Sequence, residues 1–313
     1  MKAHSVHRSL SVMRWLMTLL LLFTLDAVSF GDTPASPGLH LENGMRVQLD
    51  GTEGVFQYTR IWLIGNPQHI TRIYFVLHGD KITDYSEATA DDRQEMAEAL
   101  PKGEGGIIAY PVSCGDRSWP PFTGGGLQRK NAPVLVKMFR QLAQSVGNEN
   151  ATFEQFALSG AGKVNMALLC LIIEKYDSDA DVRSFVDRNL RGIHDGAALC
   201  YDPFTMVTAY YQVLSKHPAC RASFIHNTNP GEEVDYGYLY HFKVAELFED
   251  GMTEARFPKG GSLSLQNGRL RFWSNPLHMD TWRTQFRRVF LSSELPSIRA
   301  SSPEAVDAEG PEA

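Results

Sequence analysis

Long apolar runs, basic clusters and closely paired cysteines are all scarce in this sequence. Beyond the N-terminal stretch, no apolar segment reaches the roughly 20 residues that a membrane-spanning helix needs. The net charge is −6 and no strong Lys/Arg cluster is present, which argues against a nucleic-acid partner, because such a protein needs a basic face. There is no C-x-x-C pair to indicate a zinc site, and no internal repeat.

The few cysteines leave their pairing open. Cys200 and Cys220 flank one predicted helix, so a disulfide across that helix is a hypothesis. Cys170 lies in an apolar helical run and is expected to be a small core residue. Cys114 completes the set of four, which allows three full pairings.

Residues 1–29 are typical of a cleaved export signal. Basic residues precede an apolar stretch over 15–25, and Ala27 and Ser29 are small residues placed for a cut before Phe30. An uncleaved anchor is the alternative, but the apolar run is shorter than a membrane span requires. We therefore expect an exported protein, periplasmic or secreted, with no stable membrane span after processing.

The overall composition is that of an ordinary globular protein. A hydrophobic content of 43% and a charged content of 21% are typical of a folded domain, and the length allows a large core. Residues 30–40 are predicted to be a linker and 41–299 a single large domain. Residues 300–313 are acidic, without large apolar side chains, and are predicted to be a disordered tail.

Strand-like and helix-like segments alternate through most of the chain. Strand character is found over 45–49, 55–64, 72–77, 106–111, 153–158, 190–194, 222–226 and 270–273. Helical character is found over 88–100, 131–146, 162–176, 202–216 and 280–291. This alternation predicts an α/β fold with a mostly parallel central sheet and helices on both faces. The segments 113–129 and 236–268 are expected to form the walls or lid of a substrate site.

Ser159 lies between an apolar run and a helix-like run. Ala157 and Ala161, two residues to either side, allow a very tight strand-to-helix turn that lifts the serine hydroxyl out of the backbone. The usual form of this motif is G-x-S-x-G, and alanine stands here at both glycine positions. A plain turn serine is the alternative interpretation.

Further reactive side chains follow other predicted strands. A His-Gly-Asp segment ends at Asp80, Asp195 closes the strand after the Ser159 helix, and His278 comes just past the last strand. In an open α/β sheet, functional groups gather at the carboxyl ends of the strands. We therefore expect these residues to meet Ser159 at one edge of the sheet.

This arrangement resembles the α/β-hydrolase superfamily over roughly residues 45–292, in particular its exported bacterial members. The resemblance rests on the His-Gly segment at Gly79, the turn at Ser159 and the chain order Ser…Asp…His. It implies an α/β-hydrolase-type fold and a serine hydrolase with no metal and no organic cofactor.

The resemblance also implies a role for each residue. Ser159 would be the nucleophile, His278 the base that takes its proton, and Asp195 the acid that orients the imidazole. The oxyanion hole would be formed by backbone N–H groups at Gly160, Gly79 and Asp80.

The identity of the acid stays open. Asp195 directly follows its strand, whereas in most superfamily members the acid comes one strand later. In this chain that later region contains Glu232, Glu233 and Asp235.

The predicted reaction is cleavage of an ester, or less readily an amide, through an acyl-enzyme. The substrate would be a small-molecule or polymer-linked ester. One alternative is acyl transfer to an envelope glycan or lipid. Another is a non-catalytic hydrolase-fold protein that binds a ligand or partner.

Three further residues have structural interpretations. His194 and His226 lie inside predicted strands and are expected in the core or in hydrogen bonds. Lys163 follows Gly162 in a near miss to a phosphate-binding loop, but Val164 replaces the hydroxyl that would bind Mg²⁺. Lys163 is therefore expected as an exposed side chain in the first turn of a helix.

Overall fold

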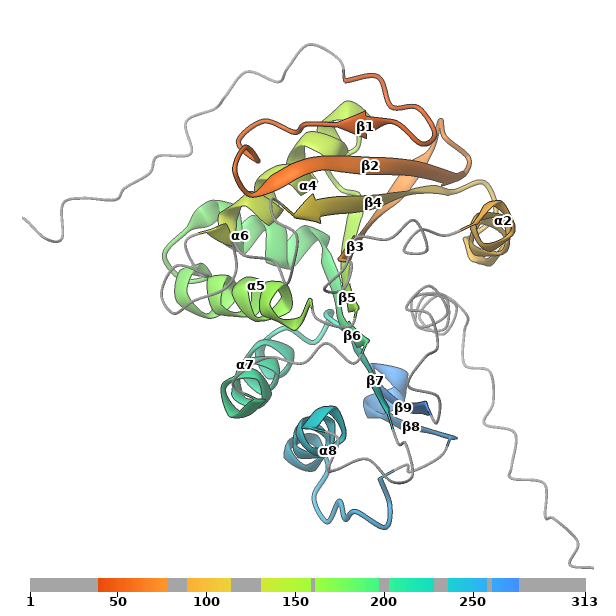
Figure 1. Ribbon diagram of the computed structural model, residues 1–313. Coiled ribbons are helices and arrows are strands. Elements are labelled where there is room, and N and C mark those ends of the chain that lie inside the picture. Colours follow the sequence, from red (N-terminus) through yellow and green to blue (C-terminus); the bar gives the residue numbers. More distant parts are fainter. Residues whose placement is uncertain are drawn as a thin grey trace, which may run out of the picture. The chain divides into compact units, whose positions relative to one another are not determined.

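The computed structural model describes residues 39–77, 89–113, 131–158, 161–196, 203–227, 236–257 and 261–275. They fall within one compact unit, Leu39–Ala313. In this part of the chain a sheet of nine strands forms the centre, in the order β1-β2-β4-β3-β5-β6-β7-β9-β8 (Figure 1).

Six of these strands, β4, β3, β5, β6, β7 and β9, run parallel as neighbours. At one end β2 is antiparallel to β1 and β4, and at the other β8 is antiparallel to β9. The predicted mostly parallel sheet is confirmed. The strands are β1 Arg46–Val47, β2 Phe56–Gly65, β3 Ile70–Leu77, β4 Gly105–Ser113, β5 Thr152–Leu158, β6 Leu190–Gly196, β7 Ala222–Asn227, β8 Gly261–Leu265 and β9 Leu270–Asn275.

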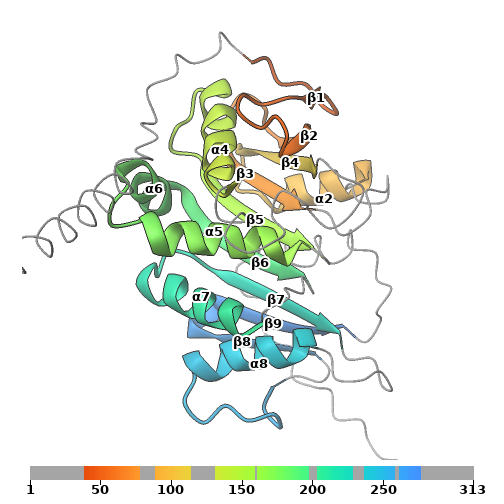
Figure 2. The same ribbon diagram turned by 60° about the vertical axis from the view of Figure 1, so that its left-hand side comes forward.

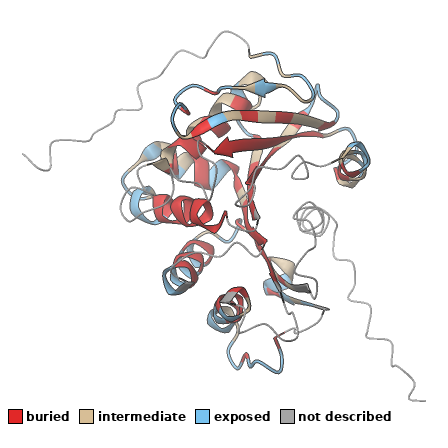
Figure 3. Cartoon of the chain, in the orientation of Figure 1, coloured by how far each residue is buried: buried red, intermediate tan, exposed pale blue. Residues whose placement is uncertain are grey.

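Helices cover both faces of the sheet, as predicted (Figures 1 and 3). One large apolar cluster joins the sheet to α4, α5, α7 and α8. A smaller cluster joins the opposite face to α2 through Met96 and Leu100. The helices are α2 Ala90–Ala99, α4 Pro133–Ser145, α5 Gly162–Lys175, α6 Ala180–Ser184, α7 Pro203–Lys216 and α8 Tyr236–Phe248, and a π-helical turn spans Phe185–Asn189.

The sequence explains the central position of β4 and β3. Every residue of β4 is buried, as are the last five of β3, because both faces are covered by helices. Helix α4 begins with Pro133, a residue suited to the first helical position, and directs Val134, Met138 and Leu142 into the core.

The segment 236–268 differs from the expected wall or lid. Helix α8 buries Tyr240, Val244 and Ala245 in the main core, and β8 extends the sheet beside β9. The apolar positions of α8 recur at helical spacing, which is the signal that the prediction of a lid overlooked.

Two side chains also differ from expectation. Cys220 is a free thiol buried two residues before β7, so the hypothesis of a Cys200–Cys220 disulfide is wrong. Burial raises the pKa of the Cys220 thiol to about 12, which keeps it protonated and unreactive. Lys163 is only 4% exposed, because the first turn of α5 packs into the fold instead of facing solvent.

Candidate functional site

Five parallel strands end at the same edge of the sheet, with their arrowheads on one side in Figure 2. Ser159 is the next residue after β5, and Asp195 is the second-last residue of β6. The His-Gly-Asp segment directly follows β3, and His278 comes three residues after β9. In sequence, the predicted catalytic residues therefore follow or close strands that end at one edge.

Among the predicted site residues, the structure describes Asp195. The other predicted site residues lie outside the described ranges, and their roles stay predictions. They are Gly79, Asp80, Ser159, Gly160, Glu232, Glu233, Asp235 and His278.

Asp195 lies in a fully buried polar cluster with two histidines. Its Oδ1 atom is 3.5 Å from Nε2 of His241, which α8 supplies. Nδ1 of His241 lies 3.5 Å from Nδ1 of His226, near the end of β7. All three side chains have an exposed fraction of 0%, so the cluster forms without help from solvent.

If the rings of His226 and His241 are both neutral, these contacts favour one pair of tautomers. If His226 donates from Nδ1 to Nδ1 of His241, then His241 carries its proton on Nε2, facing the carboxylate of Asp195. The opposite tautomer would direct a lone pair of Nε2 at the carboxylate.

The expectation that His226 lies in the core is confirmed.

A second buried network lies beneath the end of β5, around Asn165 in the first turns of α5. Its Nδ2 donates to the backbone carbonyl of His194 and to the hydroxyl of Tyr210, both at 2.8 Å. Its Oδ1 accepts a hydrogen bond of 2.9 Å from Nε2 of Gln155. One amide thus joins β5, β6 and α7, and it holds in place the backbone that leads into Ser159 and Asp195.

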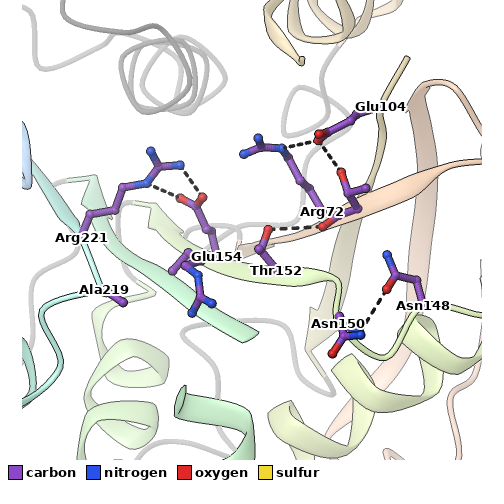
Figure 4. A pocket seen from close by; sticks show the side chains of 10 residues that line it. Arg72, Glu104, Asn148, Asn150, Thr152, Glu154, Ala219 and Arg221 are labelled. Atoms are coloured by element: carbon purple, nitrogen blue, oxygen red, sulfur yellow. Dashed lines mark hydrogen bonds and ion pairs between the residues drawn. The ribbon is translucent and has the colours of Figure 1, made fainter. Parts of the chain in front are cut away.

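A third network lies toward the amino ends of the strands, around Glu154 of β5. Arg221 donates to its two carboxylate oxygens, from Nη2 at 2.5 Å and from Nε at 3.2 Å, as Figure 4 shows. His194 lies with Nε2 2.7 Å from Oε2 of Glu154 and stacks on the ring of Phe156. The expectation that His194 is a hydrogen-bonded core residue is confirmed.

The charges of this network follow from burial and pairing. Burial alone would raise the pKa of Glu154, but attraction from Arg221 and the hydrogen bond with His194 outweigh it and lower the pKa from 4.5 to about 2. Burial lowers the pKa of His194 below 6.5 and outweighs the pull of Glu154. His194 is therefore a neutral donor to an ionised carboxylate.

Gly192 makes room for this contact. A Cβ atom at this position would overlap Nε2 of His194 and would lie 2.6 Å from Oε2 of Glu154. The absence of a side chain at Gly192 therefore allows the imidazole to reach the carboxylate across β6 and β5.

Sequence reasoning missed Glu154, Asn165 and His241. A signal for Glu154 was present, since a carboxylate inside the apolar run of β5 must find a partner when it is buried. The partner itself could not be identified, because Arg221 lies 67 residues further along the chain.

Within the described ranges, no helix is both long and apolar enough to cross a membrane. The described His, Cys, Asp and Glu side chains also form no group of three or more suited to a metal ion. Glu154 is bound by Arg221 and His194, and Asp195 lies beside His241.

No protein-family model and no curated relative matches this sequence. Solved structures with similar folds include a siderophore hydrolase, EstB, from Aspergillus nidulans, at 9% identity and a TM-score of 0.45, covering 84% of this chain and 97% of that one. The BES protein from Bacillus cereus is 9% identical with a TM-score of 0.49, covering 83% and 97%. A feruloyl esterase module from Clostridium thermocellum is 11% identical with a TM-score of 0.43, covering 82% and 95%.

Proposed function

We propose that this chain is an exported serine hydrolase that cleaves an ester bond through an acyl-enzyme. One observation carries the proposal: the strands that precede Asp80, Ser159 and His278, and the strand that contains Asp195, are parallel neighbours or near neighbours in one sheet. Their carboxyl ends share one edge, which is where an open α/β sheet gathers its functional groups.

The proposed reaction follows from the residue types. The hydroxyl oxygen of Ser159 attacks the ester carbonyl while His278 takes its proton, and the negative charge that develops on the carbonyl oxygen is held by backbone N–H groups of Gly160 and Asp80. His278 then protonates the leaving alcohol. Water, activated by the same imidazole, attacks the acyl-enzyme and releases the acid, which restores Ser159.

The acid of the triad is proposed to be Asp195, with the residues after β7 as the alternative. Support for Asp195 comes from its place at the end of β6, where Gly196 is the register partner of Leu158, the residue before Ser159. Asp195 already contacts the imidazole of His241, so His278 would have to share its carboxylate. Glu232, Glu233 and Asp235 follow β7 and would leave the Asp195–His241 pair undisturbed.

Labelling with a fluorophosphonate tests the nucleophile. We expect the mature protein to be labelled once and Ser159→Ala to be unlabelled. Ser178→Ala is the matched control, because Ser178 is exposed in the turn after α5 and its side chain makes no hydrogen bond to the described residues. Labelling of Ser159→Ala would remove Ser159 from the mechanism, and a folded but unlabelled wild type would favour a binding protein.

Turnover of p-nitrophenyl acetate tests the base and the acid. His278→Ala and the substitution of the true acid by its amide are expected to lower kcat by orders of magnitude with the fold intact. Comparing Asp195→Asn with Glu232→Gln, Glu233→Gln and Asp235→Asn identifies the acid. Turnover that requires an added glycan or lipid acceptor would instead indicate an acyltransferase.

A further inference from the structure

A pocket of about 430 Å³ opens at the amino ends of the parallel strands, opposite the edge that leads to Ser159. Residues from the starts of β3, β5 and β6, and from the turns before β4, β5 and β7, line it. Figure 4 shows Arg221 with Glu154 on one side and Arg72 with Glu104 on the other. The pocket is thus separate from the proposed catalytic edge.

Positive charge is in excess in this pocket although the whole protein carries a net charge of −6. Arg72, Arg191 and Arg221 line it together with Glu104 and Glu154, and the guanidinium of Arg191 donates to the backbone carbonyls of residues 187, 188 and 190. The carboxylates are held internally: Glu154 is fully buried by its partners, and Glu104 accepts hydrogen bonds from Thr71 and Arg72.

A further guanidinium adds to this field. Arg271, on β9, has a pKa lowered first by burial and then by repulsion from Arg221. Two cations that repel each other at one site are stabilised when an anion binds between or beside them. Arg221 and Arg271 carry two positive charges against the one carboxylate of Glu154, which favours an added negative charge near them.

Neutral hydrogen-bonding groups complete the lining. Asn150 is exposed, and its backbone N–H donates a hydrogen bond of 3.1 Å to Oδ1 of Asn148, which fixes the turn. The side-chain amide of Asn150 forms no hydrogen bond to the described residues and lines the pocket (Figure 4). It offers a donor to a ligand at no cost to the fold.

We propose that this pocket binds a small anion bearing a phosphate or carboxylate group, held by the guanidinium groups of Arg72 and Arg221 and by the amide of Asn150. Guanidinium groups attract the oxygens of these anions by their positive charge and by charge-assisted hydrogen bonds. The volume is that of a small-molecule site and leaves room for an organic part beyond one oxyanion. The proposal is independent of the catalytic role of Ser159.

Isothermal titration of the mature protein with sodium phosphate and with citrate tests the proposal, at constant ionic strength set by chloride. We expect saturable binding of one equivalent of at least one of the two anions, and preference between them distinguishes phosphate from carboxylate recognition. Absence of heat from both anions, with the protein folded, would overturn the proposal.

Two variants locate the binding site. Asn150→Asp adds a negative charge without changing the side-chain shape and is expected to weaken anion binding about fivefold or more. Gln57→Glu makes the same change of charge on an exposed position of β2, far from the amino ends of the parallel strands, and is expected to have no effect. Arg72→Gln is expected to weaken binding by roughly tenfold.

The comparison of the two charge variants decides the outcome. Equal affinities of Asn150→Asp and Gln57→Glu would show that the anion binds elsewhere and would overturn the proposal. Because Asn150 is exposed and its side chain makes no hydrogen bond to the described residues, its substitution is expected to leave the melting temperature unchanged.

Discussion

Arg221, one residue before β7, donates two hydrogen bonds to the carboxylate of Glu154 in β5, and these bonds cross over β6. His194 of β6 adds a third contact from between them. Three neighbouring strands are thus held in register near their amino ends by one ionised carboxylate. Register here also sets which residues reach the carboxyl edge, where Ser159 and Asp195 are expected to act.

The stability of the protein should depend on pH through Glu154. Its pKa falls from 4.5 in the unfolded chain to about 2 in the fold, so the stabilisation is present above pH 4.5 and is lost as the pH falls toward 2. At roughly 1.36 kcal/mol for each pKa unit, the loss is about 3 kcal/mol. Urea denaturation between pH 6 and pH 2 measures it.

His194 also makes the protein less stable as the pH falls, but in a higher pH range than Glu154. Because its pKa is lowered in the fold, the unfolded chain takes up a proton first as the pH falls below 6.5. Glu154→Gln should be less stable at pH 7 and should show a flatter pH dependence below pH 4.5. An unchanged acid dependence in Glu154→Gln would show that other carboxylates control it.

Gly192→Ala should destabilise the fold by about 3 kcal/mol. The added methyl group meets His194 and Glu154 in a fully packed environment, and the backbone of Gly192 is not in the left-handed region, so the cost is steric. Combining it with His194→Ala removes the ring that the methyl group meets. The double variant should lose less than the sum of the single losses, whereas strict additivity would contradict the steric account.

Asn165→Leu should cost about 2–4 kcal/mol of unfolding free energy. It leaves the amide of Gln155 and the carbonyl of His194 without their buried partner while keeping the branched shape of the side chain. Tyr210→Phe removes one bond of the same network and should cost about 1 kcal/mol. Equal losses in the two variants would show that Asn165 does not organise the network.

The pairing of Asp195 with His241 should appear as a coupling between two substitutions. His241→Phe in the wild type removes the imidazole from a buried carboxylate and should cost about 1–3 kcal/mol. In an Asp195→Asn background the same substitution should cost at least about 1 kcal/mol less. A double-mutant cycle by urea denaturation gives the coupling, and a value near zero would contradict the pair.

Phe204 is expected to contact the substrate. It lies in the first turn of α7, which starts beyond the carboxyl end of β6, and 78% of it is exposed. Phe204→Ala should raise the KM for an ester with an aromatic acyl group about fivefold while leaving kcat unchanged. Leu247→Ala, on the exposed side of α8, should leave the KM unchanged. An equal effect of the two variants would remove Phe204 from the binding surface.

Much of the architecture was predictable because it depends on local patterns. The strands over 72–77 and 153–158 and the helices over 131–146 and 162–176 were found within a few residues of their bounds, since each has the apolar period of its element. Helix α8 was missed although its spacing was present, because the whole segment 236–268 was predicted to form the walls or lid of a substrate site.

The sequence by itself determined the alternation of strands and helices, and with it a parallel sheet whose carboxyl ends precede Ser159 and His278. It could not determine which buried charges meet. Glu154 and Arg221, or Asp195 and His241, are far apart in the chain, and only the strand order and the packing of α8 bring them together. A carboxylate in an apolar segment indicates that it will need a partner when it is buried. Which residue becomes that partner depends on distances that exist only once the chain has folded.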